Sequence, residues 1–322
     1  MIIVTGGAGL IGSNIVKDLN DKGRKDILVI DNLTNADKCR NLNGLSILDF
    51  VDKNDFSDAL RQGVYNYEDI DVIFHQGACS DTMEYNGRYM MKNNYEYSKM
   101  LLHFCLERKI PFIYASSASV YGNGQKGFAE KPECEQALNI YAFSKLFFDR
   151  YVQRFLKQPH SQIVGLRYFN VFGPQEQHKG KMASMVYQMY NQIKKDGKIK
   201  LFKGINGIGD GEQKRDFIYV KDCVKMNMFF FEKAPKTCGV FNCGTGTAHS
   251  FNQLAKAVID YMKKGEIEYV DFPQVLVGKY QNYTQADSKK FLEAGYDGGF
   301  YSLNDAIVDY CKLLDSTDGY FE

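Results

Sequence analysis

Tyr141 and Lys145, in the segment YAFSKLFFDRYV, have the types and spacing of a proton-transfer pair. On a helix, residues four apart share one face, so the ammonium group can lie close to the phenol. A tyrosine with an ordinary pKa of about 10 needs about 4 kcal/mol of differential stabilisation of its phenolate to act as a base near neutrality. A neighbouring cation stabilises the phenolate and so lowers the tyrosine pKa.

Ser117, which ends the apolar run PFIYASS, could hydrogen-bond the substrate hydroxyl from which Tyr141 takes a proton. The same residues are also common on ordinary amphipathic helices and in turns, so the assignment depends on the segments around them.

The glycines of VTGGAGLIGSNIV indicate a phosphate-binding turn at the start of the chain. Gly7, Gly9 and Gly12 fit G-x-G-x-x-G, and Gly6, Gly9 and Gly12 form an overlapping frame. The motif follows an apolar run typical of a strand and opens a helical segment, where a pyrophosphate can lie at the helix N-terminus. The sequence therefore predicts a dinucleotide site, with an oxidised nicotinamide as a second cation beside Tyr141.

Residues after the glycine turn leave the choice between NAD and NADP open. Asp31 ends the next apolar run, about 20 residues beyond Gly12. Its carboxylate could bind the ribose hydroxyls, which favours NAD because it repels a 2′-phosphate. Asn32, Lys38 and Lys53 lie downstream, where an amide and two cations could bind that phosphate.

Short apolar runs alternate with longer amphipathic segments, which predicts an α/β fold with a doubly wound parallel sheet of the Rossmann type. The runs are IIVTG, ILVIDN, DVIFHQGA, PFIYASS and IVGLRYFNVFG, and residues 89–109 between them read as a helix. Helical and strand signals become less regular after Gly173, with a helix expected over 182–195 and another from Ser250 to Lys263. We expect a dinucleotide-binding domain over residues 1–170, to which 217–245 return, and a smaller C-terminal substrate-binding domain over 171–322.

Composition argues against a nucleic-acid-binding, membrane-bound or secreted protein. Forty basic and 39 acidic residues give a formal charge of +1, so no protein-wide field would recruit nucleic acid or an anionic membrane. Eight cysteines without metal-ligand spacing are expected to be reduced thiols, and no metal site is predicted. The start MIIVTGGAG lacks signal-peptide features, and no apolar run is long enough to span a bilayer, so we expect a cytoplasmic protein.

The chain resembles the extended short-chain dehydrogenase/reductase family along essentially its whole length. TGGAGLIG, SSASVYG, YAFSK and RYFNVFGP occur in that family's order, and GACSDT, YMMKNNYEYSK, RYFNVFGPQEQHKGKMAS, KRDFIYV and YQNYTQAD resemble its nucleotide-sugar epimerases. The resemblance implies a redox-neutral epimerisation at C6″ of an ADP-heptose of lipopolysaccharide cores. A bound NADP would take a hydride and return it to the opposite face. The resemblance also implies a homo-oligomer, in the form of a pentamer.

The resemblance assigns roles to individual residues. Tyr141 matches the first acid/base group, and Lys179, in HKGK, matches the second on the other side of the sugar. Ser117 and Lys145 complete the predicted catalytic set. The predicted cofactor-binding residues are Gly6, Gly9, Leu10, Ile11, Gly12, Asp31, Asn32, Lys38, Lys53, Gln76, Gly77, Ala78, Cys79, Ser80, Asn93, Lys145, Val171 and Lys179. The predicted substrate-binding residues are Asn170, Lys181, Gln188, Phe202, Lys203, Gly204, Ile205, Arg215 and Tyr280.

The substrate pocket departs from the family pattern in places. Lys181 and Gln188 occupy positions where relatives are expected to carry a small hydroxyl residue and a histidine, and GINGIGDGEQ is longer than usual. Arg215 could clamp a diphosphate through two parallel hydrogen bonds, or could pair with Asp216 or another carboxylate. We expect His178 to shape its loop rather than to transfer protons.

Three other functions remain open at the level of sequence. A 4-epimerase of the same family would keep Ser117 and Tyr141 but does not explain HKGK. A dehydratase is expected to carry an acidic pair, as in TDEVYG, where this chain has SSASVYG. A cofactor-sensing protein could share the fold without catalysis, although such proteins often lose the tyrosine or the lysine.

Overall fold

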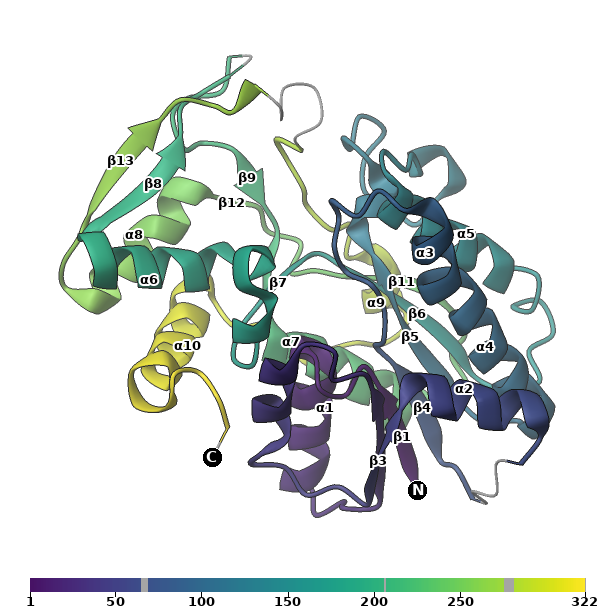
Figure 1. Cartoon of the computed structure of the whole chain (residues 1–322). Coiled ribbons are helices and arrows are strands. Elements are labelled where there is room, and N and C mark those ends of the chain that lie inside the picture. The colour runs from purple at the N-terminus through teal and green to yellow at the C-terminus, as the bar shows by residue number, and fades with distance from the viewer. Residues whose placement is uncertain (65–68, 206, 275–280, 322) are drawn as a thin grey trace.

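A seven-stranded parallel sheet forms the centre of the computed structural model, in the order β11-β6-β5-β4-β1-β2-β3 (Figure 1). The structure describes residues 1–64, 69–205, 207–274 and 281–321. The strands of the sheet are β1 (Ile2–Thr5), β2 (Ile27–Asp31), β3 (Asp49–Asp52), β4 (Val72–His75), β5 (Phe112–Ser117), β6 (Ile163–Tyr168) and β11 (Gly239–Cys243). The predicted doubly wound α/β fold is confirmed. The order of the strands reverses between β1 and β4, where parallel α/β sheets bind their ligands.

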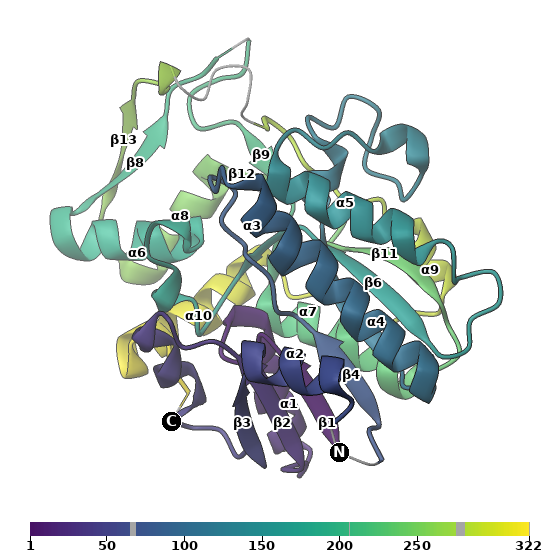
Figure 2. The same ribbon diagram turned by 45° about the vertical axis from the view of Figure 1, so that its right-hand side comes forward.

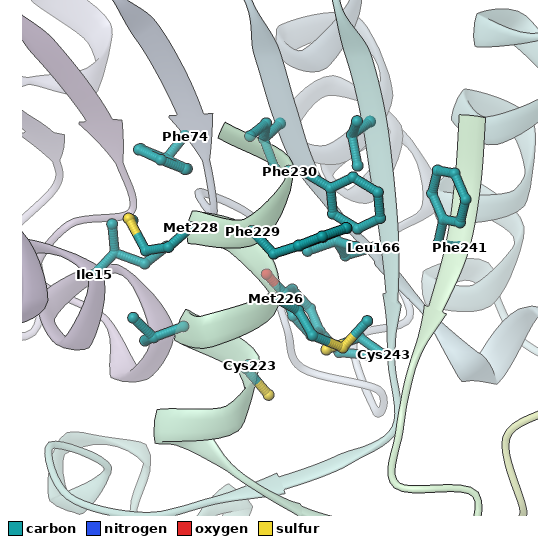
Figure 3. Packing of buried hydrophobic residues seen from close by; sticks show 14 of the residues in the cluster. Ile15, Phe74, Leu166, Cys223, Met226, Met228, Phe229, Phe230, Phe241 and Cys243 are labelled. Carbon is teal, nitrogen blue, oxygen red and sulfur yellow. The ribbon is translucent and has the colours of Figure 1, made fainter. Parts of the chain in front are cut away.

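Helices cover both faces of the sheet, as the near-continuous apolar strands require. Ile2 and Val4 of β1 face one side, and Ile3 faces the other. The first face packs against α1 (Leu10–Asp21) and α7 (Val220–Met228), whose core includes Ile15 and Met226 (Figure 3). The second face packs against α2 (Lys53–Gln62), α4 (Tyr97–Arg108) and α5 (Ile140–Val152). The side chains of this doubly buried sheet fix the register of the strand ends that carry the predicted site residues.

The helix predicted over residues 89–109 contains an interruption. Helix α3 (Gly87–Met91) continues through a π-helical turn (Lys92–Glu96) into α4. A π-turn inserts an extra residue, and such turns frequently occur at functional sites. Here the turn carries Asn93 and Asn94, both of which contact the candidate site described below.

A second core lies beside the sheet. It is formed by α6 (Met185–Asp196), α8 (Phe251–Met262), α10 (Leu303–Thr317) and the strand β8 (Lys198–Phe202), which pairs with β13 (Glu266–Val270). In both views α6, α8, β8 and β13 gather to the left of the sheet (Figures 1 and 2). Short pairs join β7 (Asn170–Phe172) to β10 (Phe217–Tyr219) and β9 (Lys214–Arg215) to β12 (His249–Ser250), and α9 (Lys289–Glu293) packs near β11. The predicted cap of α8 is confirmed, because Ser250 and Gln253 form a capping box.

Segments from the C-terminal half return to the sheet. β11 pairs with β6 over Gly239–Cys243, and α7 packs on α1. β10, also within 217–245, pairs with β7 outside the seven-stranded sheet. The edge strand β3, whose side chains are partly exposed, had no strong sequence signal. The division into domains at residue 170 stays a prediction. In the part of the chain that the structure describes, no helix is long and apolar enough to cross a membrane.

Candidate active site

A cleft of about 760 Å³ opens at the carboxyl ends of the strands, across the point where their order reverses. All the predicted cofactor-binding residues line it, from Gly6 to Lys179. The four predicted catalytic residues, Ser117, Tyr141, Lys145 and Lys179, line the same cleft. Asn170 is the one described residue of the predicted substrate set among its walls. The structure therefore brings the glycine turn and the proton-transfer groups together, although strands and helices far apart in sequence supply them.

The glycine turn leaves no room for side chains, as a dinucleotide cradle requires. Gly6 has a φ of +67°, and a Cβ atom there would lie 2.6 Å from the amide nitrogen of Gly77. A Cβ atom at Gly12 would lie 2.2 Å from the carbonyl oxygen of Gly6. Helix α1 begins at Leu10 with Gly9 as its N-cap and has no side-chain cap. Its first N–H groups and positive dipole end are thus directed at the cleft, where a pyrophosphate fits.

Asp31 lines the cleft and is already paired with a cation. One carboxylate oxygen, Oδ2, accepts a hydrogen bond from the backbone N–H of Ala8 (2.9 Å), and the other forms an ion pair with Lys38. Lys53 donates to Asn93 on the same wall. Burial lowers the pKa of Lys53. The repulsion that a lone Asp31 would exert on a 2′-phosphate is therefore offset by Lys38.

The catalytic helix and strand meet at Tyr141, Lys145 and Ser117. Asn139 caps α5 through the N–H of Ala142 (2.8 Å), which fixes the helix start at Ile140, one residue before Tyr141. Burial raises the pKa of Tyr141, and its hydrogen bond with Ser117 acts in the opposite direction. In the polypeptide without cofactor the pKa of Tyr141 is therefore raised, and a lowered pKa beside an oxidised nicotinamide stays a prediction.

The ammonium of Lys145 is directed at the strand end. It donates to the carbonyl of Ala115 (2.7 Å), two residues before Ser117. Burial lowers its pKa to about 8, while the negative charge of Asp149 opposes that change. Lys145 consequently stays mostly protonated at neutral pH and holds a positive charge beside the cleft.

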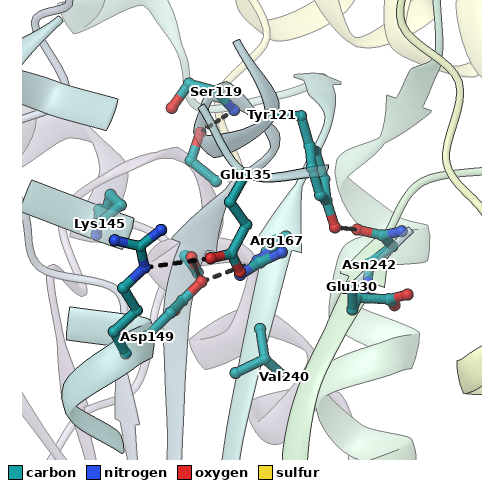
Figure 4. Close-up of polar contacts among 12 residues, drawn as sticks. Ser119, Tyr121, Glu130, Glu135, Lys145, Asp149, Arg167, Val240 and Asn242 are labelled. Atoms are coloured by element: carbon teal, nitrogen blue, oxygen red, sulfur yellow. Dashed lines mark hydrogen bonds and ion pairs between the residues drawn. The ribbon is translucent and has the colours of Figure 1, made fainter. Parts of the chain in front are cut away.

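A buried ionic cluster of Arg167, Asp149 and Glu135 lies next to α5 and β5, the elements that carry Tyr141 and Ser117 (Figure 4). The guanidinium of Arg167, whose side chain is 2% exposed, donates Nε–H to Asp149 (2.8 Å) and pairs with Glu135. Asp149 also accepts hydrogen bonds from Tyr114 (2.9 Å) and Ser116 (2.8 Å). The cluster therefore joins α5, which carries Tyr141, to the strand that carries Ser117.

Asp149→Asn is expected to lower the free energy of unfolding by about 3–5 kcal/mol, because it removes one of the two carboxylates that pair with the buried charge of Arg167. Arg150→Gln provides the matched control. Arg150 is next to Asp149 on α5 and reaches Glu135 (3.3 Å) from a half-exposed position, so its loss should cost about 1 kcal/mol or less. Urea denaturation of both variants measures the difference. Similar losses in the two variants would contradict a special role for the buried pair.

Lys179 reaches the cleft from a separate loop, the 3₁₀ segment Gln177–Met182. Glu176, which is fully buried, accepts hydrogen bonds from the N–H and the hydroxyl of Ser184 and closes this loop. Burial raises the pKa of Glu176. Burial and the nearby cations Lys38 and Lys179 lower the pKa of His178 to about 4, so His178 is neutral at physiological pH.

Most of the predicted substrate-binding residues lie outside the walls of the cleft. Arg215 is 5% exposed, donates to the carbonyls of Lys214 (2.9 Å) and Gln281, and lies over the ring of Phe251, a residue of the cleft wall. Gln188 donates to the carbonyls of Lys181 and Ala183, which places it behind the Lys179 loop. Phe202 ends β8, and Lys203, Gly204 and Ile205 follow it; Lys203 pairs with Asp271. Tyr280 lies outside the described residues.

The sequence analysis missed buried polar residues that hold the cleft walls. Asn94 exchanges hydrogen bonds with the backbone of Cys79 (2.8 and 2.9 Å) and donates to Ser144 (3.1 Å). It therefore joins the loop after β4 to the catalytic helix. Its π-turn was not visible in the pattern of YMMKNNYEYSK, and an asparagine alone predicts no such contact.

The chemistry of the cysteines agrees with the expectation of reduced thiols. All eight are free. Burial raises the pKa of Cys79, the one cysteine on the cleft wall, so it is a poor nucleophile. No group of three potential metal ligands occurs within the described part of the chain.

Comparisons with known proteins agree with this geometry. The NAD dependent epimerase/dehydratase family model matches residues 2–244. The chain is 54% identical to an ADP-L-glycero-D-manno-heptose-6-epimerase of Brachyspira hyodysenteriae over 99% of both chains. It is 51% identical to a protein of the same name from Alkalilimnicola ehrlichii, over 98% of this chain and 97% of that one. The solved structure of the Helicobacter pylori ADP-L-glycero-D-manno-heptose-6-epimerase superposes with a TM-score of 0.82 at 31% identity, over 98% of this chain and 96% of that one. The chain belongs to the NAD dependent epimerase/dehydratase family.

Proposed function

We propose that this protein converts ADP-D-glycero-D-manno-heptose into ADP-L-glycero-D-manno-heptose by inversion at C6″, for the lipopolysaccharide core. The observation that carries the proposal is that Tyr141 and Lys179 line one cleft from different elements, beside the glycine turn. Inversion through a ketone requires the sugar to present both faces of C6″ to one nicotinamide, and two separate proton-transfer groups can serve the two orientations. The names of relatives that share about half of the residues support the same substrate.

The residues of the chain divide the chemistry as follows. Tyr141 accepts the proton of the C6″ hydroxyl in one orientation of the sugar, and Ser117 holds the same hydroxyl by a hydrogen bond. Lys145 supplies positive charge that favours the phenolate. Lys179 exchanges the hydroxyl proton when the sugar presents its other face. A nicotinamide cofactor held at the glycine turn would supply reversible hydride transfer at C6″, with no net oxidation.

NADP is the cofactor that the adenosine end favours. The ion pair of Asp31 with Lys38 offsets the carboxylate's repulsion of a 2′-phosphate. Asn32 and Lys53 line the same end of the cleft and offer an amide and a second cation. Calorimetric titration of cofactor-free protein should give a lower Kd for NADP than for NAD, and a preference for NAD would overturn this assignment.

The activity is tested by NMR of ADP-D-glycero-D-manno-heptose incubated with the purified protein without added reductant. We expect the C6″ epimer to accumulate until the two forms reach equilibrium. A cofactor-loaded protein that leaves this sugar unchanged but inverts C4 of a UDP-hexose would instead be a 4-epimerase. A loaded protein that changes neither sugar would be a cofactor sensor.

Assembly and location follow from the family resemblance alone. We propose a homo-oligomer, a pentamer by that resemblance, that acts in the cytoplasm on a small nucleotide sugar. Sedimentation of the purified protein at several concentrations tests the assembly, and a monomer at all concentrations would contradict it.

A further inference from the structure

Three asparagine amides tie the segment before Lys179 to the dinucleotide-binding half of the protein. Asn14 of α1 donates to the carbonyl of Pro174 (3.1 Å), and Asn35 donates to the carbonyl of His178 (2.9 Å). Asn41, in the 3₁₀ helix Ala36–Leu42, donates to the carbonyl of Gln175 (3.0 Å). The carbonyls of this loop are thus bonded by side chains more than 130 residues away in sequence.

Asn41 has the most enclosed position of the three, with an exposure of 0%. Its amide also donates to the carbonyl of Ala8 (2.8 Å), within the glycine turn, and lies 3.2 Å from Nδ1 of His178. Gln175, likewise fully buried, donates its side-chain amide to the backbone carbonyl of Asn41 (3.1 Å). One buried amide therefore bridges the glycine turn and the loop that carries Lys179.

The bridge continues to the adenosine end of the cleft. The N–H of Ala8 donates to Asp31, and the carbonyl of Ala8 accepts from Asn41, so both sides of this residue are fixed. Lys38, three residues before Asn41 on the same 3₁₀ helix, pairs with Asp31. A continuous set of short contacts therefore joins Lys38, Asp31, the glycine turn and the Lys179 loop.

We propose that Asn41 is a positioning residue for epimerisation: it sets the Lys179 loop in register with the cofactor-binding turn. This inference rests on the proposed role of Lys179. The two carbonyls that Asn41 bonds belong to the two parts that must be aligned, the cradle of the cofactor and the loop of the second proton-transfer group. Misplacement of a catalytic group by about 1 Å can lower the rate by about 100-fold.

Asn41→Ala in the full chain, loaded with NADP, tests the proposal. We expect kcat to fall by about 10–100-fold, while the KM for the ADP-heptose and the Kd for NADP change by less than about threefold. Hydride transfer, followed by absorbance of the reduced nicotinamide from each epimer separately, should slow more from the epimer that depends on Lys179 than from the one that depends on Tyr141. Amide hydrogen exchange should rise in residues 174–182. A general loss of stability would slow both hydride transfers alike.

Asn20→Ala is the matched control. The amide of Asn20 also bridges two carbonyls, those of Arg24 and Ser46 (both 2.8 Å), but away from the cleft. We expect it to leave both hydride transfers and the exchange of 174–182 unchanged. If Asn41→Ala does not fold, Asn35→Ala removes the more exposed bond to His178 and should give a smaller change of the same kind.

The outcomes separate this inference from the proposed function. If the wild-type protein leaves ADP-heptose unchanged, the proposed function fails, and hydrogen exchange alone then decides whether Asn41 holds the loop. If the wild type is active and Asn41→Ala matches Asn20→Ala in exchange and in both hydride transfers, the inference is overturned.

Discussion

Tyr141→Phe is expected to lower kcat for epimerisation by about 10²–10⁴-fold, while NADP binding stays within about threefold of the wild type. The substitution removes the phenolic oxygen that shares a hydrogen bond with Ser117 and keeps the ring on the cleft wall. Steady-state NMR assays of the two heptose epimers, with calorimetric titration of NADP, measure both effects.

Tyr151→Phe on the same helix provides the control for this prediction. The hydroxyl of Tyr151 contacts His103 (2.7 Å) on a part of α5 that does not line the cleft. The identical chemical change should therefore leave kcat near the wild-type value. Comparable losses in both variants would assign the effect to the packing of α5, and a fully active Tyr141→Phe would exclude the proton-transfer role.

Local sequence rules predicted those parts of the site whose function depends on backbone conformation or on spacing along one element. Gly6, Gly9 and Gly12 were recognisable because a dinucleotide turn excludes a Cβ atom at fixed intervals. Tyr141 and Lys145 were recognisable because a helix places residues four apart on one face. The alternation of apolar runs predicted the doubly wound sheet for a similar reason, since a strand covered by helices on both faces is apolar throughout.

Residues whose function depends on distant partners were not predictable in this way. Asn41 lies in DKCRNLNG, a polar stretch typical of a solvated turn, yet it is fully buried because residues from 8 and 175 meet around it. In the sequence, Asp149 is one of several charged residues in the segment of α5. Its partner Arg167 comes from the next strand. Packing of elements far apart in sequence creates these sites, so the residue type alone carries no signal for them.

The substrate side shows the same limit. Residues 202–205 were assigned by resemblance, and in the structure they lie at and just after the end of β8, outside the cleft walls. Phe217 and Phe251, which do line the cleft, come from two other elements, and neither was predicted as a site residue, although Phe217 lies within KRDFIYV. Loops and short strand pairs build this wall, and their positions depend on the second core rather than on a local pattern. Roles for residues 202–205 and for Arg215 therefore stay predictions.

Lys179→Arg is expected to lower kcat for epimerisation by about 10²–10⁴-fold, the same range as for Tyr141→Phe, and to leave NADP bound. An arginine keeps the positive charge and most of the length of the side chain but does not release its proton near neutral pH. The loop itself should persist, because Glu176 holds it through Ser184 and the asparagines hold its carbonyls. Loss of activity would therefore show that Lys179 acts by transferring a proton and not by its positive charge alone.

The two epimers separate this prediction from the one for Tyr141. If each group serves one face of C6″, as we propose, Lys179→Arg should slow hydride transfer from one epimer, and Tyr141→Phe should slow it from the other. Lys195→Arg, at an exposed position near the end of α6, supplies the control for a lysine-to-arginine change. If both active-site variants slowed the same epimer, the two groups would serve one face of the sugar, and the proposed division of proton transfer between Tyr141 and Lys179 would be wrong.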